Sequence, residues 1–439
     1  MEATVRRTVA SIIVIDDARG APIQDVHEHR QAACIVDVPW RFHRRRQGPL
    51  VNVHTEVSQQ VRRHRDQLIA LSHAVHEDAE LRFEEYRSSR RVADALSGSG
   101  FDVDFGVCGL DTAFSATYGS GELTIAICAE YDALPRIGHA CGHNVIAAAA
   151  VGAGHALKQV ADDLGITVRV LGTPGEEGGG GKIIMLDRGA FDGVHAAMMV
   201  HPAPNESTYM NCLAVQHLDV TFTGTSAHAA AYPQLGVNAA DALTVSEVAI
   251  GLLRQHIAPT DRIHGIVTYG GDAPNVVPHH TTGRWYVRSA DMEGLQALLP
   301  RVTRCFEAGA LATGCEVDVN GPGHAYSEFH THPAMADVWE HVAREVGRPT
   351  PLTGNGPLVG STDMANISRV IPTIHPMLAI DTDGAVNHQP EFAAAAINAS
   401  ADMAILDGAM GMASTVATIA TDPGLRAELL ARSYRSTPA

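Results

Sequence analysis

Three short apolar segments alternate with segments of helical pattern in this chain, and that alternation most constrains its fold. The apolar segments are Leu123–Cys128, Ile166–Leu171 and Ala196–Val200. Residues 144–164 between them are rich in alanine, and a second helical segment starts at residues 182–186. Strands that alternate with helices form a parallel sheet with right-handed crossovers. The sequence therefore predicts an α/β fold whose largely parallel central sheet is flanked by helices.

A different order of elements begins near residue 214. The patterns predict a strand at 215–222, a helix at 236–256, strands at 262–269 and 284–288, a helix at 292–311 and a strand at 315–319. This β-α-β-β-α-β order is that of a ferredoxin-like module. Helices and strands then alternate again, with an apolar strand predicted at 371–380. We expect a catalytic α/β domain of residues 55–213 and 322–430, interrupted by an α+β domain of residues 214–321.

The N-terminal residues 1–54 stand apart from this organisation. Their apolar stretch, Ile12–Ile15, ends at two aspartates and is too short for the core of a signal peptide. We assign no function to this extension. After it, apolar residues at helical spacing predict a helix from Val57 to Val75, and a second helix follows Glu84 and ends near Gly98.

The charge and cysteine content narrow the class of partner. A net charge of −17 over 439 residues argues against a nucleic-acid partner. No apolar run approaches the roughly 18 residues of a membrane span. The seven cysteines are scattered and odd in number, which favours a reducing compartment over a disulfide framework. We expect a cytoplasmic protein with no nucleic-acid or membrane partner.

Potential metal ligands follow each of the three apolar strands. Cys141 and His143 come after the first strand, in the sequence His139-Ala-Cys-Gly-His, and His201 ends the third. Residues i and i+2 of an extended loop can both turn toward one ion, and zinc-like metals bind Cys, His, Asp and Glu. Ligands in an open α/β sheet bind at the carboxyl ends of the strands. The pattern therefore predicts a metal site at this edge of the sheet.

The acid pair Glu176-Glu177 follows the second strand, just before a run of glycines. Adjacent acids lie on opposite sides of an extended backbone, so one can bind metal while the other faces the substrate. Late in the chain, His388 stands in a loop that leads into an alanine-rich helix. Spacing alone leaves open whether His388 belongs to the site.

Seven motifs together resemble those of the aminoacylase and carboxypeptidase-like metallopeptidase family, in that family's order. They are AEYDALPRIGHACGHN (129–144), GTPGEEGGGGK (172–182), MMVHP (198–202), GTSAHAAAYP (224–233), NVVP (275–278), GSTDMANIS (360–368) and HQPEFA (388–393). The resemblance spans about residues 57–425. The branch it resembles most includes hippurate hydrolases, indole-acetyl-amino-acid hydrolases and aminobenzoyl-glutamate hydrolases.

The resemblance implies a role for several single residues. One or two divalent ions, Zn or Mn with Co or Ni as alternatives, would be held by Cys141, His143, Glu177, His201 and His388. Glu176 would be the general base. His228 of the inserted domain would reach the active site of a neighbouring subunit, and Asn275 and Arg288 would hold a substrate carboxylate. The inserted domain would thus serve as a lid and a dimerisation domain of a homodimer.

Three positions depart from the family pattern. Arg136 stands where relatives often have glycine, Gly175 where many have alanine, and Asn144 where many have aspartate. Loss of that acid weakens the support of a metal ligand, and Arg136 lies where it can alter substrate choice.

The reaction we predict is hydrolysis of the amide C–N bond of an N-acyl amino acid, an aminobenzoyl-glutamate-like compound or a small dipeptide. Metal-activated water would be the nucleophile. One alternative is a hydrolytic deaminase that acts on an aryl amine with the same metal site. Another is a non-catalytic metal-binding protein on this scaffold.

Overall fold

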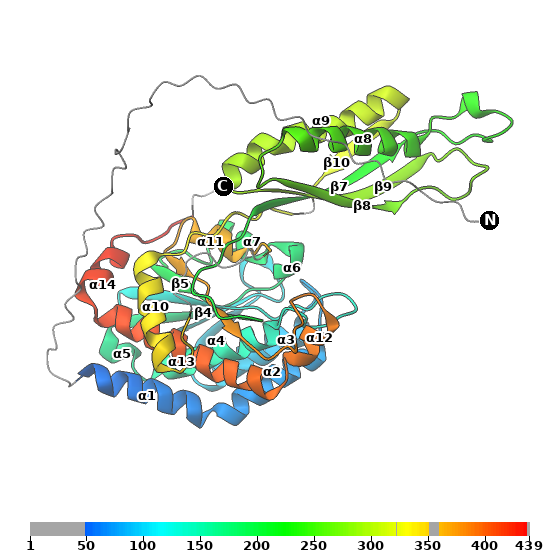
Figure 1. The fold of residues 1–439 in the computed structure, drawn as a ribbon. Coiled ribbons are helices and arrows are strands. Elements are labelled where there is room, and N and C mark those ends of the chain that lie inside the picture. The colour runs from blue at the N-terminus through cyan, green and yellow to red at the C-terminus, as the bar shows by residue number, and fades with distance from the viewer. Residues whose placement is uncertain (1–48, 322, 351–359, 437–439) are drawn as a thin grey trace, which may run out of the picture. The chain divides into compact units, whose positions relative to one another are not determined.

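A six-stranded mixed sheet forms the centre of the larger part of the chain (Figure 1). The computed structural model describes residues 49–321, 323–350 and 360–436. In spatial order the strands are β1 (Asp102–Phe105), β2 (Phe114–Tyr118), β4 (Ile166–Gly172), β3 (Leu123–Ala129), β5 (Ala196–Met198) and β11 (Thr373–Ile374). Strand β3 is parallel to both β4 and β5, and β11 is parallel to β5. The predicted α/β fold is confirmed. The antiparallel strands β1 and β2 add an edge that the apolar pattern of the sequence did not predict.

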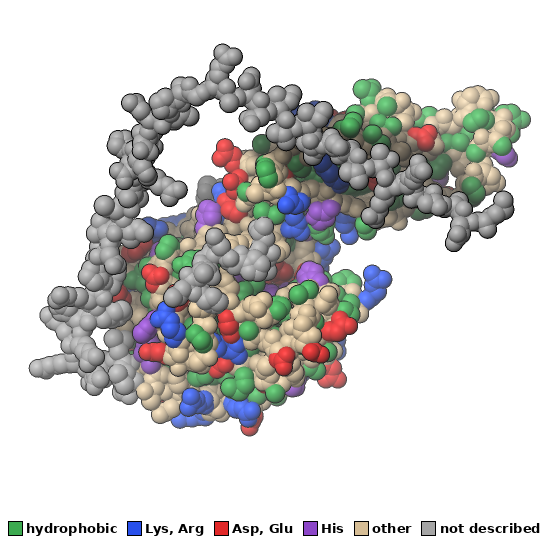
Figure 2. Space-filling model, viewed as in Figure 1, with side chains coloured by type: hydrophobic (Ala, Val, Ile, Leu, Met, Phe, Trp, Pro, Cys, Tyr) green, Lys and Arg blue, Asp and Glu red, His purple; other side chains and the backbone are tan. Residues whose placement is uncertain are grey.

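Helices cover both faces of this sheet. They are α1 (Pro49–Arg63), α2 (Arg65–Asp78), α3 (Tyr86–Gly98), α4 (His143–Lys158), α5 (Ala161–Leu164), α6 (Glu176–Gly179), α7 (Gly181–Asp187), α10 (Pro333–Glu345), α11 (Met364–Ser368), α12 (Pro390–Ala395), α13 (Ala399–Thr421) and α14 (Pro423–Leu430). Helices α2, α4 and α13 lie on one side of the sheet, and α7 and α11 lie on the other (Figure 1). Acidic and basic side chains are interspersed on the face of these helices that Figure 2 draws.

Close packing of α4 against α13 forms the centre of the core. A Cβ built on Gly152 of α4 would lie 2.8 Å from the Cβ of Ala409 of α13, so only glycine fits there. Among the described residues, α13 alone is long and apolar enough to cross a membrane. Because 83% of its apolar window is buried inside the protein, α13 has the character of a core helix.

Residues 214–320 form a second, antiparallel sheet. Its strands, in spatial order, are β10 (Glu316–Asn320), β7 (Ala214–Thr223), β9 (His280–Ser289) and β8 (Arg262–Tyr269). Helices α8 (Ala239–Leu253) and α9 (Met292–Thr313) pack on it around the buried rings of Phe222, Trp285 and Phe306. The chain order is the β-α-β-β-α-β order predicted for the ferredoxin-like module. The remaining elements are β6 (His201–Ala203), which pairs with β12 (Met377–Ala379), and the 3-10 turns η1 (Val107–Gly109), η2 (Pro233–Leu235) and η3 (Arg254–His256).

Two predicted elements are broken in the structure. The apolar segment 371–380 is not one strand: β11 pairs with β5 in the central sheet, whereas β12 pairs with β6. Pro376 lies between them, and proline lacks the backbone N–H that a continuous ladder needs. The predicted helix 57–75 begins earlier, at Pro49, and is divided into α1 and α2 at His64. Residues 1–48 of the proposed extension lie outside the described residues.

Candidate metal centre

The predicted ligands follow the carboxyl ends of β3, β4 and β5. The loop of residues 130–142 after β3 carries Cys141 and leads into His143, the first residue of α4. Gly142, at φ 73°, lies so close to the β6 segment that an added Cβ would be 2.4 Å from Cγ of Pro202. This contact brings the turn against His201, which starts β6. Glu176 and Glu177 follow β4 at the start of α6.

Two groups of potential ligands share His143. One combines it with His201 and Glu130, and the other combines it with Cys141 and Glu177; in each group the ligand atoms lie within 4.8 Å of one another. His388 joins the second group, because its Nε2 is 3.5 Å from Oε1 of Glu177. The structure thus brings together all five of the residues that the resemblance implied as ligands.

Hydrogen bonds orient both central histidines. Nδ1 of His143 donates to the carbonyl oxygen of Asp132 at 2.8 Å and lies 3.0 Å from its Oδ1, so Nε2 faces the cluster. Nδ1 of His201 donates to the carbonyl oxygen of Pro202 at 2.8 Å, and burial lowers the pKa of His201 to about 4. A neutral imidazole held by its other nitrogen is the usual form of a histidine ligand. His139 points elsewhere, since its Nε2 lies 3.0 Å from the carbonyl oxygen of Val75.

The buried polar atoms of this cluster fit a cation. Nε2 of His143 and Oε1 of Glu177 are buried and have no hydrogen-bond partner within the described chain. Burial, and then the charge of Glu177, raise the pKa of the Cys141 thiol well above its usual value. Bound metal reverses such a shift, because it favours the thiolate. Thiolate, imidazole and carboxylate together are a zinc-type donor set.

Glu176 lies beside the two ligand groups. Its side chain lines the pocket, and its Oε2 is 4.0 Å from Nε2 of His143. Burial and the neighbouring carboxylates, Glu130 first, raise its pKa well above the usual range. Its backbone carbonyl accepts a 2.7 Å hydrogen bond from the hydroxyl of Tyr326, which fixes the start of α6.

A buried ion cluster that sequence reasoning missed lies behind Glu176. Nζ of Lys182 is 2.5 Å from Oε1 of Glu130 and 2.8 Å from Oδ1 of Asp363, and all three side chains are fully buried. The ammonium already occupies the space between these carboxylates, so that space is not a metal site. Glu130 and Asp132 alternate directly after β3 in a quoted motif, and this alternation could have identified them. Asp363 is distant in sequence, and only tertiary folding places it here.

The pocket of about 430 Å³ that opens onto the cluster has cationic side chains on its other walls. Nη1 of Arg288 donates to Oγ of Ser361 at 2.8 Å, and no carboxylate among the described residues pairs with this guanidinium. Arg82 also lines the pocket and donates to the backbone carbonyl of Glu177. An unpaired guanidinium in a partly buried site suits an anionic ligand.

His228 and Asn275 do not reach this pocket in the same chain. They are exposed and lie together, where the amide of Ala229 donates to the carbonyl of Asn275 at 3.0 Å. Their loops leave the sheet at the end where Thr223 pairs with His280, whereas Arg288 pairs with Val215 at the other end. Arg288 and His280 are eight residues apart on β9, which at a rise of about 3.4 Å per residue is roughly 27 Å.

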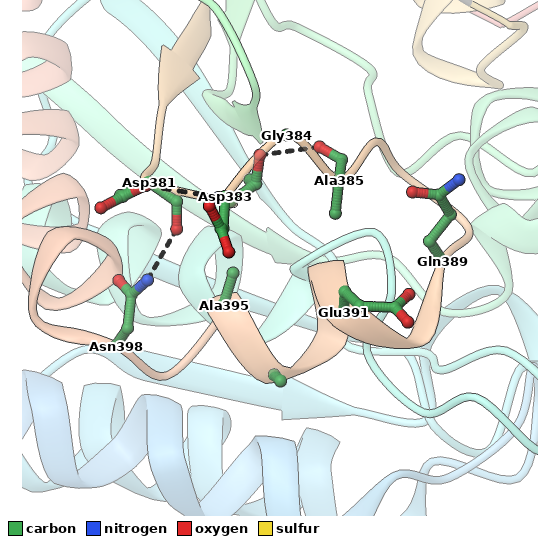
Figure 3. Close-up of a pocket in the computed structure, with 10 residues that line it drawn as sticks. Asp381, Asp383, Gly384, Ala385, Gln389, Glu391, Ala395 and Asn398 are labelled. Carbon is green, nitrogen blue, oxygen red and sulfur yellow. Dashed lines mark hydrogen bonds between the residues drawn. The ribbon is translucent and has the colours of Figure 1, made fainter.

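A second cavity, of about 530 Å³, contains none of the predicted ligands (Figure 3). Asp381, Asp383 and Glu391 line it, and Nδ2 of Asn398 donates to the carbonyl of Asp381 at 2.7 Å. It has no histidine or cysteine in its lining. The pocket of about 430 Å³, which contains the predicted ligands, is therefore the candidate active site.

The chain is similar in sequence to proteins of known family. Residues 126–405 match the family described as Peptidase family M20/M25/M40. The chain is 37% identical to the Xaa-Arg dipeptidase of Mus musculus over 377 residues, which cover 82% of this chain and 87% of that protein. It is 36% identical to one of the p-aminobenzoyl-glutamate hydrolase subunits of Escherichia coli (strain K12), over 54% of each chain.

Solved structures share the fold. The aminobenzoyl-glutamate utilization protein of Klebsiella pneumoniae aligns with a TM-score of 0.68 at 20% identity, over 84% of this chain and 99% of that one. A Bacillus subtilis protein described as a dinuclear metal binding peptidase from the M20 family aligns with a TM-score of 0.62 at 20% identity, over 82% and 99%. With the matched family and the two relatives, the fold and the ligand cluster lead to one conclusion: the chain belongs to peptidase family M20/M25/M40, in the branch of amide-bond hydrolases that its motifs resemble.

Proposed function

We propose that this enzyme cleaves the amide bond of an N-acyl amino acid, an aminobenzoyl-glutamate-like compound or a small dipeptide. One observation carries the proposal: a single pocket is lined by Glu176, by members of two ligand groups and by Arg288, whose guanidinium has no carboxylate partner among the described residues. A base, a metal site and an anchor for a carboxylate are what such a substrate requires. The cations on the pocket wall favour substrates with a free carboxylate.

The metal would be held by Cys141, His143, Glu177, His201 and His388, and the donor set suits Zn or Mn, with Co or Ni as alternatives. When bound, one or two such ions supply an acidified water and polarise the scissile carbonyl. Glu176 is close to the ligands without belonging to either of the two groups that share His143, so its carboxylate is free to take the proton of the attacking water. It then delivers that proton to the leaving amine. A carboxylate whose pKa is raised is a stronger proton acceptor than an exposed one.

Arg288 would bind the substrate carboxylate, with Oγ of Ser361 holding the guanidinium in place. Asn275 and His228 would act on the pocket of a second copy of the chain. His228 would donate a hydrogen bond to the oxyanion that forms on the scissile carbonyl. The roughly 27 Å along β9 that separates the two ends of the sheet supports a role across subunits.

Exposed apolar side chains on the inserted domain support a homodimer. Strand β8 is an edge strand of the four-stranded sheet, and its Ile266 and Val267 are 65% and 45% exposed. Val248 and Leu252 of the adjoining α8 are 59% and 70% exposed. Unpaired edges with apolar side chains are suited to pairing with another strand. The inserted domain would thus serve for both dimerisation and closure.

The six described cysteines are all unpaired, which fits a reducing compartment such as the cytoplasm. In such a compartment the enzyme would meet soluble metabolites with a free carboxylate.

Hydrolysis of a substrate panel by the metal-loaded protein tests the proposal. The panel contains N-acyl amino acids, aminobenzoyl-glutamate, dipeptides with a C-terminal arginine and a substituted aniline, and bound metal is measured in parallel. Wild type should cleave an amide substrate. Glu176→Gln should still bind metal but should not cleave that substrate. Glu293→Gln, at an exposed glutamate in the first turn of α9, is the matched control. Release of ammonia from the aniline alone would favour the deaminase, and bound metal without any turnover would favour the non-catalytic alternative.

A further inference from the structure

The two carboxylate oxygens of Glu130 have different neighbours, Lys182 on one side and His143 on the other. The Glu130 side chain is fully buried, and Oε1 forms the 2.5 Å ion pair with Nζ of Lys182. Oε2 has no hydrogen-bond partner, and it lies 3.4 Å from Nε2 of His143, which has none either. Two buried polar atoms that face each other without a hydrogen bond carry a desolvation cost unless a third group satisfies both.

The separations of these atoms match a shared ion. Two ligands bound to one tetrahedral ion at about 2.0–2.1 Å are roughly 3.3–3.4 Å apart. The pair Glu130 and His143 is separated by 3.4 Å, and the pair Glu177 and His388 by 3.5 Å. Oε2 of Glu176 is farther from His143, at 4.0 Å. The first two distances therefore fit two coordination spheres, and the third fits a residue outside both.

We propose that Glu130 is a metal ligand, on the ion that His143 and His201 also bind, and that Lys182 is the residue that positions it. This inference rests on the proposed function only in requiring that the site holds metal. The ammonium of Lys182 binds one oxygen of Glu130 and thereby fixes the orientation of the other. Asp363 in turn fixes Lys182, through its Nζ at 2.8 Å and its backbone amide at 2.9 Å.

The local charge agrees with this assignment. Glu130 and Asp363 carry two negative charges against the single positive charge of Lys182. These three side chains by themselves leave one negative charge, and a buried charge needs a counter-charge. A divalent ion next to Oε2 supplies it.

Metal binding by the full chain tests the proposal without relying on turnover. Glu130→Asp keeps the charge but withdraws the carboxylate by about one C–C bond, roughly 1.5 Å. With Zn²⁺ as the probe, we expect wild type to bind two ions and Glu130→Asp to bind one of them at least tenfold more weakly, with the other unchanged. Lys182→Met should weaken the binding of the same ion. In both variants the d–d absorption of the Co²⁺-loaded protein should lose intensity as that ion is lost. Glu85→Gln, at a buried glutamate that contacts none of the ligands, is the matched control and should keep both ions.

Each contrary result is distinguishable. Unchanged affinity for both ions in Glu130→Asp would overturn the ligand role while leaving the proposed function intact. Equal loss of both ions together with a lowered Tm would also overturn it, because it would mark a purely structural residue. If Lys182→Met lowers the Tm but changes neither affinity, its positioning role is wrong. Wild type that binds no ion would remove the metal centre and the proposed function with it.

Discussion

Restoration of activity by mixing two inactive variants tests the role of His228 most directly. The loop of His228 leaves the sheet near His280, which is eight residues from Arg288 on β9, or roughly 27 Å. Because no side chain spans that distance, the proposed function assigns His228 to the pocket of another copy. We therefore expect His228→Ala and Glu176→Ala to be inactive separately and active together. Loss of the oxyanion donor alone should lower kcat on the order of a hundredfold or more.

The recovered activity follows from the symmetry of a dimer. After equal mixing and subunit exchange, half of the dimers are mixed, and each mixed dimer has one complete site and one doubly defective site. The mixture should therefore reach about a quarter of wild-type activity. Subunits with two different tags measure exchange independently of turnover. As a control, Glu176→Ala mixed with Glu177→Ala should recover nothing, since both residues belong to the same pocket. Verified mixed dimers without activity would refute the action of His228 across subunits.

Three other outcomes follow from single residues. Glu176→Gln should lower kcat by about 10²–10⁴ because a proton acceptor is lost, while metal content stays at the wild-type value; a loss of metal would instead indicate a ligand. Arg288→Met should raise KM about tenfold or more for substrates with a free carboxylate, and Arg288→Lys should lower KM part of the way back to the wild-type value. An equal rise in KM for the same substrate with its carboxylate converted to an amide would contradict the assignment. Burial lowers the pKa of His139 from 6.5 to about 3, so the folded state keeps this imidazole neutral where the unfolded chain protonates it. Its contribution to the free energy of unfolding is complete above pH 6.5 and is lost as the pH falls toward 3, by up to about 5 kcal/mol. Denaturant titrations of wild type and His139→Gln at several pH values should show a flatter profile for the variant, and parallel profiles would be contrary to this reasoning.

The central sheet and the inserted module were predictable because their signals are local. Apolar strands between Leu123 and Val200 alternate with helical segments, and the parallel pairing of β3 with β4 and β5 follows from that order. The edge strands β1 and β2 carry a weaker apolar pattern and were missed. The break in the segment 371–380 was missed as well, since a continuous apolar run does not reveal which sheet each half joins.

The sequence by itself determined where the candidate metal ligands gather. Cys141, Glu177 and His201 follow three neighbouring strands, and parallel strands carry their carboxyl ends to a single edge. Chain connectivity enforces that convergence, so no tertiary information is needed for it. The resemblance added His388, which comes from a distant loop.

Only the tertiary structure decided which other groups surround that edge. Lys182 and Asp363 are 181 residues apart, yet they form an ion pair that is fully buried beside Glu130. Packing of α7 against α11 brings them together, and packing between distant segments leaves no periodic trace in sequence. The same holds for the separation of His228 from the pocket, because the length of β9 becomes decisive only once its register with β7 is fixed. Local pattern therefore located the centre, and long-range packing set the charge and geometry around it.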